Sequence, residues 1–246
     1  MPGAWPSPTP PPDLSTRARH GLRLALDALA AVLVAPDCAA CGRPLDEPSQ
    51  GPVCRDCWGA VHRFTGGPRD RRAAAAGPYE GRLRDIIHAF KYDGRRTLAQ
   101  PLATLMREAG RDILDGADIV VPVPLHWWRR RRRGFNQAAL LAGHLGLPVC
   151  HALRRGRRTR PQAGLHADER RTNVAGAFRP AWRYRWPRAR AAAGLAPQPL
   201  SGLVAVLVDD VSTTGATGAA CARVLREAGV REVRVLTVAR VAAPPR

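Results

Sequence analysis

The chain has 246 residues and a formal net charge of +19, from 39 basic and 20 acidic side chains. This length accommodates one α/β domain of ordinary size and a small appendage. The positive charge favours polyanionic partners, such as nucleic acid, acidic membrane surfaces or phosphorylated substrates, without naming a nucleic-acid function by itself. No stretch of the sequence is apolar for long enough to span a bilayer, so we expect no membrane span.

The amino-terminal segment begins with a proline-rich, aperiodic stretch, and we expect residues 1–20 to form a disordered tail. The apolar segment 22–34 follows several arginines and could be mistaken for a signal peptide. However, Asp27 interrupts it, and no small-residue cleavage site leads into a secreted domain. We therefore expect an amphipathic helix that packs on the fold.

Four of the six cysteines form two CxxC pairs with twelve residues between them. This spacing is typical of a closed four-thiolate zinc site, so the metal should be structural; unrelated buried cysteines are the alternative. A metal pattern in place of a disulfide framework favours a cytoplasmic location. We expect a helix and zinc-binding lobe over 21–64, a linker over 65–77 and the main domain over 78–241. The predicted ligands are Cys38, Cys41, Cys54 and Cys57.

Two helices are predicted at the start of the main domain. Apolar residues recur at i, i+3, i+4 and i+7 from Leu83 to Phe90, and a second helix carries the apolar residues of 98–106 toward Ile113. Lys91, the only lysine, lies on the flank of the first apolar stripe. A lone lysine in an arginine-rich chain suits a position that needs a compact ammonium, and survival by chance is the alternative.

Residues 118–125 begin as a buried strand and end in Pro122-Val123-Pro124, which predicts a rigid loop at the carboxyl end of the strand. Five consecutive arginines, 129–133, follow this loop and lead into a helix predicted over 137–145. The arginine run is either a solvated face or a surface that binds a diphosphate or a nucleic-acid backbone. The residues of this predicted basic surface are Arg131, Arg132, Arg133, Asn136 and Gln137.

The segment 148–201 carries weaker signals. Residues 148–150 are a short strand candidate, and the basic segment 154–172 is expected to be a mobile loop of the kind that closes over phosphorylated substrates. Tryptophan, tyrosine and arginine alternate within 180–201. This segment either stacks single-stranded nucleic acid or is a flexible surface insertion. A final apolar strand is expected over 233–238.

The central prediction concerns the apolar run 203–208, which reads as a strand buried on both faces. Asp209 and Asp210 follow it, and then a turn opens a helix that stops at Gly229. Ligands bind outside the carboxyl ends of strands in open α/β sheets, and a helix N-terminus binds phosphate. Adjacent acids suit the cis-diol of a ribose or a metal bound to it. The stretch therefore predicts a ribose 5-phosphate site, with an ordinary βα unit as the alternative. The turn residues are Thr213, Thr214, Gly215, Ala216 and Thr217.

This stretch resembles the phosphoribosyl-pyrophosphate (PRPP) motif of type I phosphoribosyltransferases. From about Leu24 to Arg240, the whole chain resembles the ComF family, and only the segment 180–201 is longer than expected. The motifs that carry the resemblance are the CxxC pairs, Phe90-Lys91-Tyr92, Pro122-Val123-Pro124, Arg133-Gly134-Phe135-Asn136-Gln137, Thr159 with Gln162, Arg171 with Asn173, and the Asp209-Asp210 loop.

The resemblance implies a type I phosphoribosyltransferase fold, with a mostly parallel central sheet flanked by helices, and a small zinc-binding amino-terminal lobe. It further implies that Asp209 and Asp210 hold the ribose hydroxyls and that residues 213–217 cradle the 5′-phosphate. The loop 122–124, aided by nearby arginines and Lys91, would receive the diphosphate with Mg²⁺. Purine-using relatives generally place an Asp at the position of Thr213, so a 6-oxopurine acceptor is disfavoured.

Two functional hypotheses follow from these motifs. The first is a PRPP-dependent phosphoribosyltransferase with an unidentified acceptor, acting in DNA uptake during natural transformation or in nucleotide metabolism. The second is a non-catalytic accessory protein that binds single-stranded DNA, works with other DNA-uptake proteins and retains the phosphoribosyltransferase scaffold. A transcription factor is a weaker alternative, because the sequence has no helix-turn-helix pattern.

Overall fold

The structure is a computed structural model that describes residues 36–64, 72–125, 127–156, 176–181 and 200–241. Several predicted features lie outside the described residues. They are the tail 1–20, the helix over 22–34, the motif residues Thr159, Gln162, Arg171 and Asn173, and the part of the insertion over 182–199.

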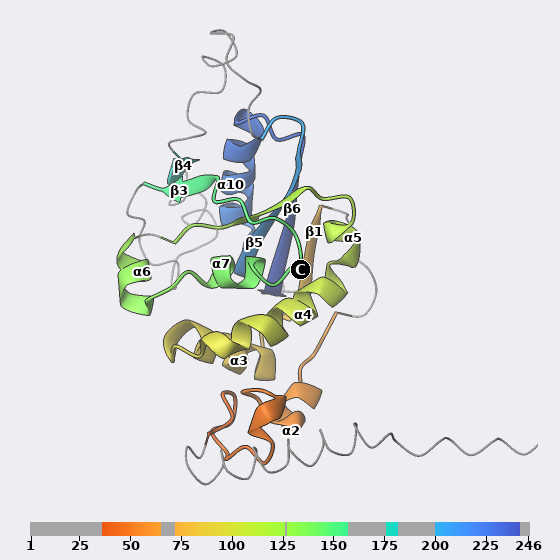
Figure 1. Cartoon of the computed structure of the whole chain (residues 1–246), viewed down its shortest axis with the longest axis vertical. Helices are drawn as coiled ribbons and strands as arrows, with labels where there is room; N and C mark the ends of the chain where they lie inside the picture. Colours follow the sequence, from red (N-terminus) through yellow and green to blue (C-terminus); the bar gives the residue numbers. More distant parts are fainter. Residues whose placement is uncertain (1–35, 65–71, 126, 157–175, 182–199, 242–246) are drawn as a thin grey trace, which may run out of the picture.

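A four-stranded parallel sheet forms the centre of the molecule, with the strand order β1-β6-β5-β2 (Figure 1). The strands are β1 (Ala73–Pro78), β2 (Ile119–Pro122), β5 (Val204–Ser212) and β6 (Glu232–Arg240). The apolar runs predicted as buried strands are thus β2, β5 and β6, with β5 in the interior of the sheet. A separate antiparallel pair joins β3 (Leu153–Arg155) to β4 (Phe178–Pro180).

Helices cover both faces of the sheet. The helices α3 (Gly81–Tyr92), α4 (Ala99–Ala109) and α7 (Gln137–Ala142) share a hydrophobic cluster with Val206 and Val208 of β5. On the opposite face, α10 (Ala216–Glu227) and the β3–β4 pair share a second cluster with Ala205 and Leu207. Successive residues of a strand point to opposite faces, so an unbroken apolar run is what a strand covered on both sides requires. The shorter helices are η1 (Pro48–Gln50), α2 (Arg55–Gly59), η2 (Arg96–Leu98), α5 (Arg111–Leu114) and α6 (Trp127–Arg133).

The predicted linker 65–77 is wrong from Ala73 onward, because this stretch is strand β1. Its alanines pair in parallel with β6, from Ala73 opposite Val235 to Pro78 opposite Arg240. A run of four alanines between Arg72 and Gly77 has little hydrophobicity of its own, and the strand that pairs with it comes from the far end of the chain. The main domain therefore begins with β1 and not at residue 78.

The second predicted helix is interrupted where the sheet approaches it. The helix α4 ends at Ala109, and α5 begins after Gly110. A Cβ atom at Gly110 would lie 2.5 Å from the Leu236 side chain of β6 and 2.9 Å from Met106 O, so a larger residue would force these neighbours to shift. The predicted strand 148–150 is reduced to a single bridge between Val149 and Val120.

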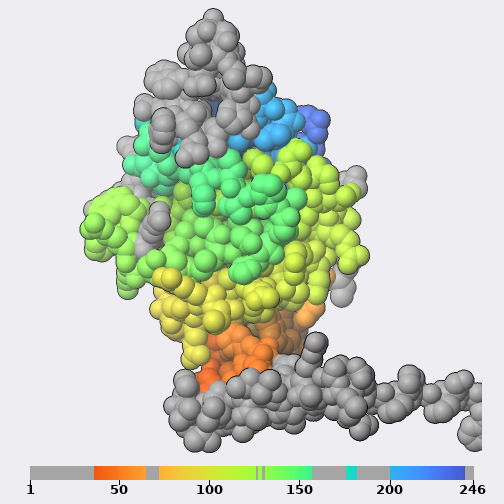
Figure 2. Space-filling view, in the orientation of Figure 1, coloured from red at the N-terminus to blue at the C-terminus, as the bar shows by residue number. Residues whose placement is uncertain are grey.

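The four-cysteine lobe, residues 36–64, packs directly against the main domain (Figure 2). Its buried residues belong to the same cluster as α3, and Phe64 N donates a hydrogen bond of 3.0 Å to Ala76 O of β1. A Cβ atom at Gly77 would lie only 2.3 Å from His62 O, which shows how closely the two chain segments approach. The predicted α/β fold class, with helices flanking a parallel sheet and a four-cysteine lobe, is confirmed. The buried lobe residues in this cluster are Cys38, Leu45, Val53, Cys57 and Val61.

Among the described residues, no helix combines the length and the apolar character that crossing a bilayer requires.

Candidate functional site

The acidic pair lies near the carboxyl end of β5, beside the proline loop that follows β2. Pro122 pairs with Val208, and Val123 N donates a hydrogen bond of 2.9 Å to Val208 O. The next residue after Val208 is Asp209, and the backbone N–H of Asp210 donates a bond of 2.9 Å to Asp209 Oδ1. The parallel register between β2 and β5 therefore brings the proline loop and the two acids to one edge of the sheet.

The two acids differ in their electrostatic environment. Burial and the neighbouring Asp210 carboxylate together raise the pKa of Asp209 to about 7, against the opposing effects of the Asp210 N–H, Lys91 and Arg155. A carboxyl group with this pKa exchanges its proton near neutral pH. Such strong shifts are common at functional sites, where a buried charged group is held close to a charge of the same sign.

The Lys91 ammonium pairs with Asp210 across the cleft. Its Nζ lies 2.8 Å from Asp210 Oδ1, and each of the two side chains is only 13% exposed. Burial alone would lower the pKa of Lys91, but Asp210, Asp209 and Tyr79 together outweigh this effect and raise it, so the lysine is charged. The Tyr79 ring lies 5.9 Å from the same ammonium.

The turn that follows β5 is exposed and opens α10. Gly215 precedes the helix with a φ of 73°, a left-handed conformation that favours glycine. Residues 213–215 are exposed, and Thr214 Oγ1 accepts a hydrogen bond of 3.4 Å from Ala216 N. The turn residues 213–217 line the same cleft as the acidic pair, except that Thr214 is not part of the lining. The first turn of this twelve-residue helix thus lines the cleft, and a helix N-terminus favours anions.

Asn136 joins the proline loop to α7. Its side chain caps α7 by accepting a bond of 3.1 Å from Ala138 N, and its Nδ2 donates a bond of 3.1 Å to Val123 O. Asn136 and Gln137 were predicted as part of a basic surface, but Gln137 is only 1% exposed. The predicted surface role of Gln137 is therefore wrong, whereas Asn136 is half-buried and its predicted role stays a prediction.

The two family motifs on α3 and before α7 pack against each other. The ring of Phe90 lies 5.6 Å from that of Phe135, and both side chains are buried. Arg133 lies over the Tyr92 ring at 4.8 Å, and its Nη2 donates a bond of 3.1 Å to Tyr92 Oη. The residues on both sides of Lys91 are therefore fixed by the Arg133-to-Gln137 motif.

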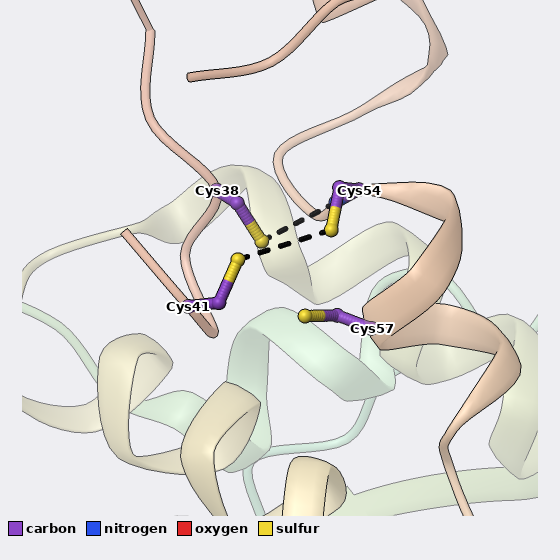
Figure 3. Close-up of side chains that lie close together, drawn as sticks. All are labelled: Cys38, Cys41, Cys54 and Cys57. Carbon is purple, nitrogen blue, oxygen red and sulfur yellow. Dashed lines mark hydrogen bonds between the residues drawn. The ribbon is translucent and has the colours of Figure 1, made fainter. Parts of the chain in front are cut away.

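The four cysteines of the lobe converge on one point, as Figure 3 shows. Their Sγ atoms all lie within 4.8 Å of one another, an arrangement that can hold a metal ion. Backbone N–H groups of Ala40 and Cys54 donate to Cys38 Sγ at 3.4 and 3.3 Å. The neighbouring Arg43 lowers the pKa of Cys41 to about 6, whereas burial raises the pKa of Cys57. Cysteine binds metals as the thiolate, so Cys41 is the more readily ionised of these two candidate ligands.

The similarity of this chain to curated proteins shows its family. The chain is 33% identical over 216 residues to competence protein F of Haemophilus influenzae, with 83% of this chain and 85% of that protein covered. The chain belongs to the ComF family. This ComF protein is also 32% identical over 218 residues to the DNA utilization protein YhgH of Salmonella typhimurium, covering 82% and 83% of the two chains. It is 28% identical over 193 residues to competence protein ComFC of Bacillus subtilis, covering 78% and 72%.

No protein-family model matches this ComF chain. Among solved structures, it is similar to the allosteric regulatory enzyme of purine biosynthesis, with 21% identity over 61% of this chain and a TM-score of 0.37. It is equally similar to glutamine phosphoribosylpyrophosphate amidotransferase from B. subtilis, with 20% identity over 62% of this chain and a TM-score of 0.37. The chain spans 30% of the length of each of these two enzymes.

Two features of the ComF site were missed by sequence reasoning. Arg155 of β3 lines the cleft with Asp209, and its charge lowers the pKa of that acid. Trp127 and Trp128 on α6 are 55% and 53% exposed, with their rings 6.1 Å apart and nearly perpendicular. The Trp-Trp pair beside five arginines could have signalled this surface. For Arg155 the sequence offered no signal, because the arginine belonged to a segment read as a basic loop.

Proposed function

We propose that this protein binds PRPP with Mg²⁺ at the carboxyl end of β5 and acts as a phosphoribosyltransferase. The observation that supports the proposal best is the placement of the acidic pair between the proline loop and the N-terminus of α10. Asp209 and Asp210 would bind the ribose 2′- and 3′-hydroxyls, and the turn 213–217 would bind the 5′-phosphate. The loop 122–124 would receive the diphosphate with its Mg²⁺, beside Lys91 and the arginines of α6.

The chemistry of this site is orientation and charge stabilisation. Transfer from PRPP breaks the bond between C1 and the diphosphate through an oxocarbenium-like state. The chain would hold the ribose and the phosphate in place and stabilise the charge that develops on the diphosphate as it leaves. Thr213 cannot accept a proton at neutral pH, so the acceptor we propose is not a 6-oxopurine.

The biological setting we propose is DNA uptake in the cytoplasm, with nucleotide metabolism as a related role. Two of the similar proteins are named competence proteins and a third a DNA utilization protein, which supports this setting. We further propose that the four-cysteine site holds structural Zn²⁺, because four thiolates complete a tetrahedral shell. A reducing compartment keeps such thiols available for the metal.

Calorimetric titration with PRPP and Mg²⁺ tests the transferase proposal. The matched control is the Asp209→Asn/Asp210→Asn double variant, which preserves side-chain size and removes both negative charges. We expect Mg²⁺-dependent binding to the unmodified protein and none to the double variant. Absence of heat with the unmodified, folded protein would contradict the proposal.

A second candidate function, binding of single-stranded DNA, is favoured by the surface of α6. Arg131 lies 5.8 Å over the Trp127 ring, and Tyr92 beside Arg133 is also exposed. Exposed aromatic rings next to arginines can stack bases and neutralise phosphates. Fluorescence anisotropy with a labelled oligonucleotide should then show salt-sensitive binding that survives the double Asp variant and weakens in Trp127→Ala/Trp128→Ala. Binding that is unaffected by the tryptophan substitutions would exclude this surface.

A further inference from the structure

We propose that Lys91 is a tethered counter-cation that occupies the acidic pair of the ligand-free site and excludes free divalent cations from it. Lys91 then leaves the acids only when a phosphoribosyl ligand binds, because this ligand supplies hydroxyls for the acids and a metal-bound diphosphate. This inference rests on the proposed function and deepens it. It proposes that one side chain, Lys91, lets the site distinguish a metal–PRPP complex from a free metal ion.

The first argument is geometric. Sequence motifs assigned Lys91 to the diphosphate, but its ammonium lies 2.8 Å from the Asp210 carboxylate, where the ribose hydroxyls are expected. Both side chains are largely shielded from water, so the contact is stronger than an ion pair at the surface. A ligand that binds the acids through its hydroxyls must displace the ammonium from Asp210.

The second argument is that the backbone around Lys91 is fixed. Phe90, the residue before it, is fully buried against Phe135, and Tyr92, the residue after it, accepts a hydrogen bond from Arg133. The end of α3 therefore holds the Lys91 Cα in place, and only the four-carbon side chain can swing. A tethered cation of this kind has a high local concentration at the acids and competes with ions from solution.

The third argument is the charge balance at the pair. Among the described residues, the ionisable groups that interact with Asp209 and Asp210 include Lys91, Tyr79, Arg155 and the buried thiol of Cys221. At neutral pH, Asp210 is balanced by the ammonium, Asp209 is close to half protonated, and Arg155 adds a further positive charge. A bare divalent cation would thus enter a site that already holds two positive side chains. A metal-bound diphosphate ester carries net negative charge and meets no such barrier.

The fourth argument concerns the choice of side chain. Lys91 is the only lysine in a chain with 39 lysines and arginines together. An ammonium is compact, and its flexible stem lets it leave Asp210 and turn to the phosphates of a bound ligand. A planar guanidinium would carry the same charge but would need a wider space and a fixed geometry.

Titration with Mn²⁺ in the absence of PRPP, followed by electron paramagnetic resonance at pH 8, tests the inference. The proteins compared are the unmodified chain, Lys91→Met, Lys91→Arg and Lys91→Met/Asp210→Asn, each with a thermal melt that verifies folding. Lys91→Met should bind Mn²⁺ at least about tenfold more tightly, because one positive charge a few ångström away is removed from a shielded site. Lys91→Arg should bind Mn²⁺ as weakly as the unmodified chain, because it keeps the positive charge. The gain in Mn²⁺ affinity should disappear in Lys91→Met/Asp210→Asn.

Each outcome has a distinct meaning. A folded Lys91→Met protein with unchanged Mn²⁺ affinity overturns the inference, and so does a gain that persists without the Asp210 carboxylate. If the unmodified protein fails to bind PRPP while Lys91→Met binds Mn²⁺ more tightly, the role of Lys91 as a counter-cation is supported and the proposed transferase function fails. If PRPP binds and the Mn²⁺ gain is absent, the inference alone fails.

Discussion

Replacement of Asn136 by Ala tests how much this side chain stabilises the proline loop, residues 122–124, and the start of α7. The substitution removes two hydrogen bonds of 3.1 Å, one that caps α7 and one to Val123 O. Loss of an N-cap costs about 1 kcal/mol. Loss of the second bond costs about 1 kcal/mol more, since it leaves a partly buried carbonyl without its donor. We therefore expect Asn136→Ala to lower the free energy of unfolding by about 2 kcal/mol.

Urea unfolding followed by circular dichroism measures this loss, and Asn136→Ser provides the control. The serine hydroxyl can still cap α7 but is too short to reach Val123, so this variant should lose about 1 kcal/mol. Both variants should bind PRPP more weakly, because both release the loop proposed to receive the diphosphate. If Asn136→Ala unfolds within about 0.5 kcal/mol of the unmodified protein, neither bond holds the loop and the reasoning is refuted.

Three further predictions concern the lobe, the acids and the contact between lobe and sheet. A strong chelator, or Cys57→Ser, should unfold the lobe and lower the melting temperature, because Cys38 and Cys57 belong to the main core; an unchanged melt would contradict this. Asp209 has a folded-state pKa of about 7 against an ordinary value of 3.8, so between these values the folded protein binds more protons than the unfolded chain. Its ionisation should therefore destabilise the fold as pH rises from about 4 to 7, and urea unfolding should show that Asp209→Asn removes this decline. Gly77→Ala should cost about 2 kcal/mol through its clash with His62 O, whereas Gly59→Ala, with open space around it, should cost little in the same assay.

The elements that sequence reasoning placed well are those whose signal is local. The run that became β5 is apolar on both faces, and the CxxC spacing alone identified four cysteines whose Sγ atoms converge. Strand β1 was missed, because its alanines gain strand structure only by pairing with β6. The role of Gln137 was wrong for a similar reason. Next to five arginines it resembled a surface residue, and only the packing of α7 on the sheet buries it.

The helix α3 explains why a small four-cysteine lobe accompanies this domain. One side of α3 shares a core with Cys38 and Cys57, and Arg95, shortly after the helix, donates a bond of 3.0 Å to Asp37 O of the lobe. The carboxyl end of the same helix brings Lys91 to Asp210. A lobe of this size has too little core to fold on its own apolar burial, and four thiolates around a metal would supply the missing stability. The lobe thus supports the helix that places a buried cation on the acidic pair, and this helix links the four-cysteine cluster to the cleft.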